Sequence, residues 1–398
     1  MIGKRTTTLL AAGGMVAGMV AIAPTAQAGT TWGGPQEVSS KFGSALVVSD
    51  GGRVAAWVRT NKTSTSATGP VRTSWYRGKK KGWTPSAPIP GASESSRVQL
   101  SANGNLALIE ADGAGYLLAA RSTGNTWSAA QSIVTGTKLT DGAMSADASI
   151  VVWVEWPTSD EYPPPAGVLK SRIRNADGTW APVTTVGSVE QYSRYGNPAL
   201  ALSRDGSTLM WADQAHALVA ATRNADGSWS APVLVKQYPD DPDLESLKLS
   251  ADGSRAIWVR SGYDGILTAT RSGAVWSPVS NVTVDETAAA ALAPNGSFVA
   301  WANSDGQMLV SKWNGTKFPK PKVLGTVSTP SIALTNKTIA WTASYYRGSQ
   351  LRSVIWKKGA WTSSVRHAMT AFSPAVSYDG NTVAWATTGV KKIYSSKR

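Results

Sequence analysis

The stretch LSADGSRAIWVR (residues 249–260) decides the fold. An apolar run ending at Leu249 predicts a β-strand, the pair Asp252 and Gly253 predicts a tight turn, and residues 256–259 predict a second strand. Glycine suits the positive backbone angle of such a turn. The stretch is therefore typical of a β-hairpin with Trp258 in its second strand.

The same hairpin recurs along the chain. In the quoted copy Ser250 precedes Trp258 by eight residues. The same spacing joins Ser49 to Trp57, Ser145 to Trp153, Ser203 to Trp211, Ala293 to Trp301, and Ser377 to Trp385. A seventh copy has Ile109 in place of tryptophan, and an eighth, from Thr335 to Trp341, is two residues shorter. These eight copies indicate internal repeats.

Almost every repeat predicts a four-stranded meander. A third strand follows the hairpin, and a fourth strand opens with an aromatic residue at Trp83, Trp127, Trp180, Trp229, Trp276, Phe318 or Trp361. A single four-stranded unit cannot bury both of its faces alone, so the repeats predict an all-β β-propeller of four-stranded blades. The repeated tryptophans are then expected to pack between blades.

The two ends of the chain predict one shared blade. Residues 30–40 (TTWGGPQEVSS) are an aromatic-proline strand without a repeat, whereas the last repeat lacks such a strand. We expect the N-terminal strand to complete the last blade and close the ring. This gives eight blades, with seven as the alternative if the short repeat around Thr335 is misjudged.

The first 28 residues predict a secretory signal peptide. Lys4 and Arg5 precede a short apolar run, and Ala26 and Ala28 fit a small-residue cleavage pattern. We therefore expect a secreted protein with a single propeller domain over residues 29–398. No later stretch is apolar enough for a membrane span, and the absence of cysteine excludes disulfide bonds.

The net charge of +14 at pH 7 does not by itself predict a nucleic-acid partner. Basic residues are spread along the chain, and RGKKKG (residues 77–82) is the only tight cluster. We interpret this cluster as a solvated hairpin tip, with adsorption to an anionic cell wall as the alternative.

The sequence offers little for catalysis. His216 and His367 are the only histidines, they fall several blades apart, and no Gly-x-Ser-x-Gly nucleophile turn accompanies them. The acidic stretch at residues 238–246 contains oxygen ligands that calcium prefers but lacks the fixed spacing of an EF-hand, so we interpret it as a solvated loop. We expect no catalytic residues, no metal and no cofactor.

Aromatic residues and arginines concentrate in loops expected on one face of the ring. Tyr, Trp and Arg dominate recognition surfaces because they bury much area at low entropic cost. We therefore predict a partner-binding face. Its residues are Trp156, Tyr162, Tyr192, Arg194, Tyr195, Tyr238, Tyr263, Tyr345, Tyr346 and Arg347.

The pattern Ser-x-Asp-Gly-x-x-x-Ala-Trp, present as SADGSRAIW and SYDGNTVAW, resembles the blade motif of TolB-like and WD40-like propellers. The Trp-rich, cysteine-free chain with its two RNADG turns also resembles secreted actinomycete propellers of the dispase autolysis-inducing protein type. That resemblance implies a non-enzymatic, monomeric protein that binds a secreted metalloprotease and offers glutamines to a transglutaminase. We predict Gln307 and Gln350 as crosslinking glutamines because loop glutamines are accessible, Gln36 because it lies near the free N-terminus, and Gln99 as an inaccessible strand glutamine.

A second hypothesis uses the same face for glycans. Aromatic side chains would serve as sugar platforms, with Asp160, Glu161 or Asp264 as polar partners. A glycosidase would need two carboxyl groups at a defined separation, which a sequence does not give. A carbohydrate-binding or carbohydrate-active propeller is therefore the alternative.

Overall fold

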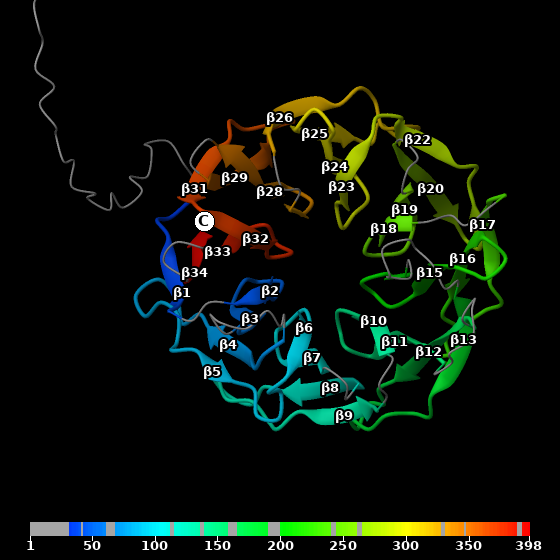
Figure 1. The fold of residues 1–398 in the computed structure, drawn as a ribbon, viewed down its shortest axis with the longest axis horizontal. Coiled ribbons are helices and arrows are strands. Elements are labelled where there is room, and N and C mark those ends of the chain that lie inside the picture. Colours follow the sequence, from blue (N-terminus) through cyan, green and yellow to red (C-terminus); the bar gives the residue numbers. More distant parts are fainter. Residues whose placement is uncertain are drawn as a thin grey trace, which may run out of the picture.

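The chain folds into eight antiparallel sheets arranged in a ring (Figure 1). The prediction of an all-β, eight-bladed β-propeller is confirmed. The repeat around Thr335 forms a sheet of its own, which removes the seven-bladed alternative. The computed structural model describes residues 32–40, 43–60, 68–111, 115–135, 139–157, 165–189, 200–239, 244–260, 265–327, 331–345, 348–387 and 392–398.

Each of the first seven blades consists of consecutive strands, the first of them innermost (Figure 1). Blade 1 contains β2 (Ser44–Val48), β3 (Val54–Val58), β4 (Val71–Trp75) and β5 (Ala87–Pro88). Blade 2 contains β6 (Ser95–Leu100), β7 (Leu106–Ala111), β8 (Gly115–Ala120) and β9 (Gln131–Val134). Blade 3 contains β10 (Leu139–Met144), β11 (Ile150–Glu155), β12 (Gly167–Ile173) and β13 (Thr184–Val189). Blade 4 contains β14 (Leu200–Leu202), β15 (Thr208–Ala212), β16 (Ala217–Thr222) and β17 (Val233–Gln237).

The second half of the ring repeats this order. Blade 5 contains β18 (Leu244–Leu249), β19 (Arg255–Arg260), β20 (Ile266–Ser272), β21 (Val275–Trp276) and β22 (Ser280–Thr283). Blade 6 contains β23 (Thr287–Leu292), β24 (Phe298–Asn303), β25 (Gln307–Lys312) and β26 (Lys322–Thr326). Blade 7 contains β27 (Ile332–Leu334), β28 (Thr338–Tyr345), β29 (Gly348–Lys357), β30 (Ala360–Trp361) and β31 (Val365–Met369). Blade 8 contains β32 (Ala371–Val376), β33 (Thr382–Thr387), β34 (Ile393–Lys397) and β1 (Gln36–Ser39).

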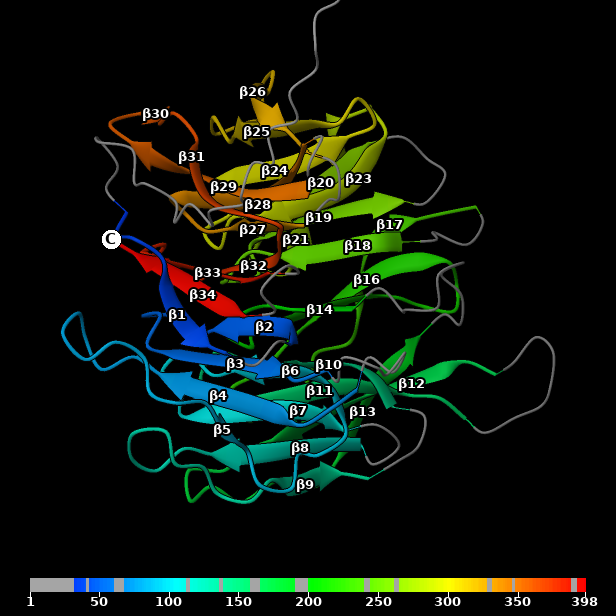
Figure 2. The same cartoon turned by 60° about the vertical axis from the view of Figure 1, so that its left-hand side comes forward.

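The N-terminal strand closes the ring as the sequence predicts. β1 pairs antiparallel with β34, with Gln36 opposite Ser395, and Figure 2 shows these two strands side by side. The Gly33 amide donates to the Lys397 carbonyl at 2.7 Å. Trp32 is buried among residues of blades 7 and 8. The N-terminal segment therefore supplies the outer strand of blade 8 and covers its contact with blade 7.

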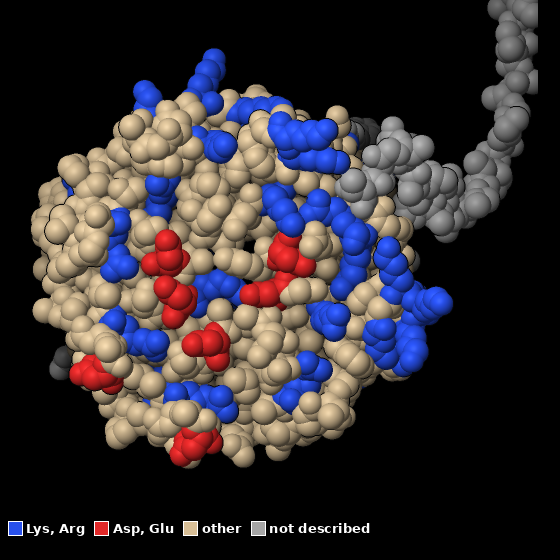
Figure 3. All heavy atoms as spheres, turned by 180° about the vertical axis from the view of Figure 1, so that it is seen from behind, with Lys and Arg blue, Asp and Glu red and all other residues tan. Residues whose placement is uncertain are grey.

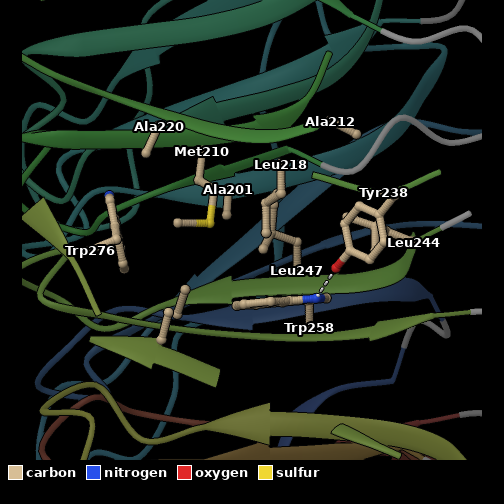
Figure 4. Close-up of a cluster of buried hydrophobic side chains, with 12 residues drawn as sticks. Ala201, Met210, Ala212, Leu218, Ala220, Tyr238, Leu244, Leu247, Trp258 and Trp276 are labelled. Carbon is tan, nitrogen blue, oxygen red and sulfur yellow. Dashed lines mark hydrogen bonds between the residues drawn. The ribbon is translucent and has the colours of Figure 1, made fainter. Parts of the chain in front are cut away.

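The second-strand tryptophans pack between blades, as predicted. These side chains are at most 1% exposed at Trp57, Trp153, Trp211, Trp258, Trp301, Trp341 and Trp385. Figure 4 shows one such contact, in which Trp258 of blade 5 lies against Met210 and Leu218 of blade 4. A buried tryptophan removes up to about 250 Å² from water. Inter-blade packing is therefore the main apolar core.

The ring has two faces that differ in their connections. The turns between first and second strands and between third and fourth strands lie on one face, here the turn face. The connections between second and third strands and from one blade to the next lie on the other, here the loop face. This division follows because each blade is a meander of antiparallel strands.

Candidate functional site

Most of the predicted partner-binding residues belong to connections of the loop face. Tyr345 ends β28 at this face, opposite Gly348, and its side chain is outside the described part. The rest of the set, apart from Trp156 and Tyr238, lies outside the described residues. These residues are Tyr162, Tyr192, Arg194, Tyr195, Tyr263, Tyr346 and Arg347, and the glycan candidates Asp160, Glu161 and Asp264 lie outside as well.

Two predicted binding residues prove to be packing residues. Tyr238 is only 5% exposed, and its hydroxyl accepts a hydrogen bond of 2.7 Å from the Trp258 indole (Figure 4). Trp156 is half-buried against the cluster between blades 3 and 4, and its indole donates to Thr140 Oγ1 at 2.9 Å. The expected exposure of Tyr238 is therefore wrong, because the buried indole of the next blade takes its hydroxyl as partner.

The predicted crosslinking glutamines lie in strands and not at loop tips. Gln350 is 4% exposed inside β29, between Ala343 and Met369 on the neighbouring strands. Gln36 opens β1 and is half-buried. Gln307 opens β25 directly after a turn, is half-buried, and its Oε1 accepts a hydrogen bond of 3.3 Å from Asn303. The expectation that Gln307 and Gln350 are loop residues is corrected, most strongly for Gln350, and Gln36 is paired in a strand.

Gln99 lies in the innermost strand of blade 2, as predicted. Its side-chain amide donates to the Gly142 carbonyl at 2.5 Å and accepts from the Met144 amide at 3.2 Å. Gln99 thus pairs with the exposed edge of β10 in blade 3. These two hydrogen bonds connect blade 2 with blade 3.

His367 is a buried structural residue. It is 5% exposed, and its Nε2 lies 2.7 Å from Ser353 Oγ. Its ring packs between Trp32, at a centroid distance of 5.2 Å, and Trp385, at 5.7 Å. Burial lowers the pKa of His367 to about 4, so the imidazole is neutral at physiological pH. The Ser353 and His367 pair stabilises the contact of the N-terminal segment with blades 7 and 8.

The turn face is built from the repeated Ser-x-Asp turn. In blade 5 the Ser250 hydroxyl donates to Asp252 Oδ1 at 2.7 Å and accepts from the Arg255 amide at 2.9 Å. The Asp252 carboxylate also accepts from the Ser254 amide at 3.0 Å. Gly253 has a φ of +65°, which glycine adopts without strain. The motif residues thus stabilise the turn that joins the two strands of the hairpin.

Backbone hydrogen bonds join these turns from blade to blade. The Asp50 amide donates to the Ala102 carbonyl at 2.9 Å, and the Ala102 amide donates to the Ala146 carbonyl at 2.6 Å. The series continues from Ala146 to Arg204 at 2.7 Å, from Asp205 to Ala251 at 3.0 Å, from Ala251 to Pro294 at 2.5 Å, and from Asp379 to Asp50 at 3.2 Å. Neighbouring blades are therefore linked around the axis by hydrogen bonds as well as by apolar packing.

Carboxylates surround the axis on the turn face. Figure 3 shows acidic side chains gathered around the centre of this face, with basic side chains mostly farther out. Burial alone would raise the pKa of Asp252, but hydrogen bonds from Ser250 and Ser254 outweigh it, and the pKa is lowered. The pKa of Asp147 is lowered by the same balance, with hydrogen bonds from Ser145 and Ser149. These carboxylates are therefore charged at neutral pH.

One arginine crosses the centre of this face. Arg204 of blade 4 forms an ion pair with Asp50 of blade 1, and its guanidinium lies 4.4 Å from the ring centroid of Tyr378 in blade 8. The second position of the turn motif holds alanine in three other blades, at Ala102, Ala146 and Ala251. We name the group of Arg204, Asp50 and Tyr378 the axial latch.

The axial latch was not predicted from the sequence. Its signal would have been the charged or aromatic residue at a motif position that holds alanine in three other blades. Within the described ranges, no group of three or more His, Asp or Glu side chains is arranged to hold a metal ion. The same part of the chain contains no helix long and apolar enough to cross a membrane.

Comparisons with known proteins give a fold and no family. No family model matches the chain, and no curated protein matches it. Among solved structures, it is similar to a protein from Bacteroides uniformis provisionally named 6-phosphogluconolactonase. The identity is 14% and the TM-score 0.51, over 80% of this chain and 97% of that one.

Two further solved structures are similar to this chain. The β-propeller domain of Swd1 from Myceliophteria thermophila is 8% identical over 92% of this chain and 99% of that one, with a TM-score of 0.48. TolB from Acinetobacter baumannii is 13% identical over 84% and 78%, with a TM-score of 0.39. The propeller fold that the TolB-like and WD40-like blade motif predicts is confirmed by the eight sheets of the ring. The resemblance to the dispase autolysis-inducing type stays a prediction.

Proposed function

We propose that this protein is a secreted, non-enzymatic binding protein whose loop face holds another extracellular protein. The observation that carries the proposal is the division of aromatic residues. The second-strand tryptophans are buried between blades, whereas six of the 11 tyrosines stand in loop-face connections or next to them. These six are Tyr162, Tyr192, Tyr195, Tyr263, Tyr345 and Tyr346.

Physical chemistry supports a protein partner for such a face. Tyrosine and arginine contribute large contact areas with few rotatable bonds, so their immobilisation costs little entropy. Loops on a rigid scaffold are the usual place for binding residues. A closed ring supplies such a scaffold because each blade is held on both sides.

Substitution of loop tyrosines tests the proposal. The triple variant Tyr192→Ala, Tyr195→Ala, Tyr345→Ala should lose capture of the partner from the producing organism's culture supernatant, with an unchanged melting temperature. The matched control replaces Lys79, Lys80 and Lys81 on the turn face by alanine and should retain capture. Equal capture by the tyrosine variant and the control would remove the loop face as the binding site.

The nature of the partner is tested separately. A secreted metalloprotease is the partner that the sequence resemblance implies, so purified protease should bind the intact protein and fail to bind the tyrosine variant. A glycan array serves as the comparison. Strong glycan binding without protein capture would replace the proposal by a carbohydrate-binding function.

The crosslinking role also belongs to the proposal. With a bacterial transglutaminase and a labelled amine, mass spectrometry should find label on Gln307, which follows a turn. Gln99 and Gln350 should stay unlabelled because both lie inside strands, and Gln350 is buried. Absence of label on Gln307 and Gln36, with a known substrate labelled in parallel, would contradict this role.

A further inference from the structure

The turn face is basic on one side of the ring. Residues 306–398, which run from the second half of blade 6 to the end of the chain, contain 14 lysines and arginines and one acidic residue, Asp379. Blade 7, at residues 331–369, contains no acidic residue. Figure 3 shows many basic side chains along the right-hand side of the turn face, which is the side of blades 7, 8 and 1. The turns of blades 3, 4 and 5 carry aspartates instead, at Asp147, Asp177, Asp205, Asp226 and Asp252.

Six exposed cations at turns of blades 1 and 7 form what we name the basic sector. In blade 1 they lie in the turn before β3 and in the hairpin between β4 and β5, and in blade 7 they lie in the turn between β29 and β30. All six side chains reach solvent. They are Arg53, Lys79, Lys80, Lys81, Lys357 and Lys358.

The lysine hairpin of blade 1 is held against blade 8. The Lys397 ammonium, at the end of β34, lies 3.8 Å from the ring centroid of Tyr76 and donates to the Gly52 carbonyl. The Trp83 indole, at the other end of the hairpin, donates to Ser395 Oγ at 2.9 Å. The base of the hairpin is therefore fixed by two contacts with blade 8, and its lysines project from a stable support.

The C-terminal residue of the chain connects this hairpin with blade 7. The Arg398 guanidinium lies 5.3 Å from the ring centroid of Trp32 and donates to the Gly380 carbonyl at 3.0 Å. Trp32 packs in one cluster with Ile355, which stands two residues before Lys357. The positive charges of Lys397 and Arg398 therefore lie between the two groups of exposed lysines.

The acidic residues of these turns are engaged elsewhere. Asp50 forms an ion pair with Arg204 of blade 4. The Asp379 carboxylate accepts hydrogen bonds from the Ser377 hydroxyl at 2.6 Å and from the Asn381 amide at 2.9 Å. Among the described residues, no carboxylate forms an ion pair with a cation of the basic sector. Like charges gathered without counter-charges attract anionic partners.

The aromatic rings beside the basic sector do not suit a nucleic-acid partner. Trp83 and Trp32 are 8% and 6% exposed, and the half-buried Tyr76 ring lies under the Lys397 ammonium. Proteins bind the bases of single strands by stacking them on accessible aromatic side chains. These three rings offer no such platform, so the anionic groups of the partner must carry the binding.

The basic sector also lacks the apolar side chains of a membrane-binding surface. The large apolar side chains that are exposed among the described residues do not belong to its turns. Peripheral membrane proteins combine basic residues with apolar ones that enter the headgroup region. A partner in solution or in a polymer matrix therefore fits this surface better than a lipid bilayer does.

We propose that the basic sector binds a linear phosphodiester polymer that carries no bases. Lysine ammonium groups are mobile point charges with three rotatable donors, so a row of them can follow a flexible chain of phosphates without fixed pairing. The sector lies on the face opposite the loop-face tyrosines. The inference therefore goes beyond the proposed protein-binding function, and both partners can be bound at once.

Fluorescence anisotropy of labelled poly(glycerol phosphate), titrated with the intact protein at low salt, tests this surface. Binding should weaken steeply as the salt concentration rises, because the contacts are electrostatic. The double variants Lys80→Gln, Lys81→Gln and Lys357→Gln, Lys358→Gln should each weaken binding by about tenfold or more, since each removes two charges near the polymer. Their melting temperatures should be unchanged because all four side chains are exposed.

The matched control removes two positive charges outside the basic sector. Lys236→Gln, Lys322→Gln changes exposed side chains of the outer strands β17 and β26, in blades 4 and 6, and should leave binding nearly unchanged. Equal binding by this control and either sector variant would overturn the proposal, because binding would then follow net charge alone.

Three comparison probes test the chemistry of the partner. Hyaluronate carries carboxylates in place of phosphates, single-stranded DNA adds bases, and phosphatidylglycerol vesicles present phosphates on a lipid surface. Tighter binding to any of these than to poly(glycerol phosphate), or no binding to that polymer, would overturn the proposal. The loop-face tyrosine variant should bind the polymer like the unaltered chain, so failure of the protein-binding function is distinguishable from failure of this surface.

Discussion

Trp258 shows how a second-strand tryptophan stabilises the contact between two blades. Trp258 is fully buried against blade 4, and its indole donates to Tyr238, which follows the outer strand of that blade. Trp211 and Trp341 make the same kind of hydrogen bond, to the Ser188 carbonyl at 3.0 Å and the Thr326 carbonyl at 3.1 Å. At these three tryptophans the preceding blade thus supplies both apolar contact and a hydrogen-bond acceptor.

Replacement of this tryptophan should be costly. Trp258→Ala removes a large side chain from a packed contact and should lower the free energy of unfolding by about 3 to 5 kcal/mol, measured by urea denaturation. Val275→Ala is the control because that side chain is 72% exposed. A loss below about 1 kcal/mol for Trp258→Ala would contradict its role in inter-blade packing.

His367 should make stability depend on pH. Burial lowers its pKa in the folded protein to about 4, whereas an unfolded histidine has a pKa of about 6.5. Between these values the unfolded chain binds the proton and the folded chain does not, so stability falls as pH decreases through this window. The loss reaches about 3 kcal/mol at most.

The variant His367→Gln tests this assignment. It should lose stability at neutral pH through poorer packing, but its stability should change less between pH values of about 6.5 and 4 than that of the unaltered chain. The measurement is urea denaturation across that range. Parallel pH curves for both proteins would contradict the assignment to His367.

At the scale of the element, the repeated turn explains its own sequence. Its glycine lies in the turn between the first two strands of a blade. It faces the first residue of the second strand in the preceding blade. A Cβ at Gly253 would overlap the Thr208 side chain, and one at Gly206 would lie 2.9 Å from Ile150. Blade 3 has Ala148 at this position with a φ of 57°, so the positive backbone angle of the turn is kept there without glycine.

Substitution of the turn glycine should therefore loosen the ring. Gly253→Ala combines a positive φ with an overlap on Thr208 and should lower the free energy of unfolding by more than about 1 kcal/mol. Gly51→Ala is the matched control, since no atom lies within 4 Å of its added Cβ. Thermal melting compares the two, and equal melting temperatures would contradict this explanation.

The hairpins were predictable because their pattern is local and repeated. A polar turn that is followed at a fixed distance by tryptophan predicts a pair of strands, and the whole pair lies within about a dozen residues of sequence. The side-chain positions of Tyr238 and Gln350 were not predictable. The hydrogen-bond partner of Tyr238 belongs to another blade, and Gln350 lies in β29, a strand that extends beyond the length its repeat predicts. The axial latch joins Asp50 and Arg204, which are 154 residues apart, and no local pattern reports such a contact.

At the scale of the whole molecule, closure distinguishes this ring from an open array of repeats. Each repeat in an open array contacts only its neighbours, so the terminal repeats are the least protected. Here the N-terminal strand and Trp32 cover blade 8 and its contact with blade 7. The Ser396 hydroxyl of the last blade also donates a hydrogen bond of 2.6 Å to the Gly33 carbonyl of the N-terminal segment. Unfolding from either terminus must first break these contacts.

The melting temperature of a chain lacking residues 29–40 tests this closure most directly. The deletion removes buried Trp32 and Val38 together with the strand pairing of β1, a loss of about 4 kcal/mol or more. We predict a melting temperature lower by several degrees than that of the chain beginning at residue 29, with faster proteolysis of β34. Melting within about two degrees of the full ring would contradict closure by the N-terminal strand.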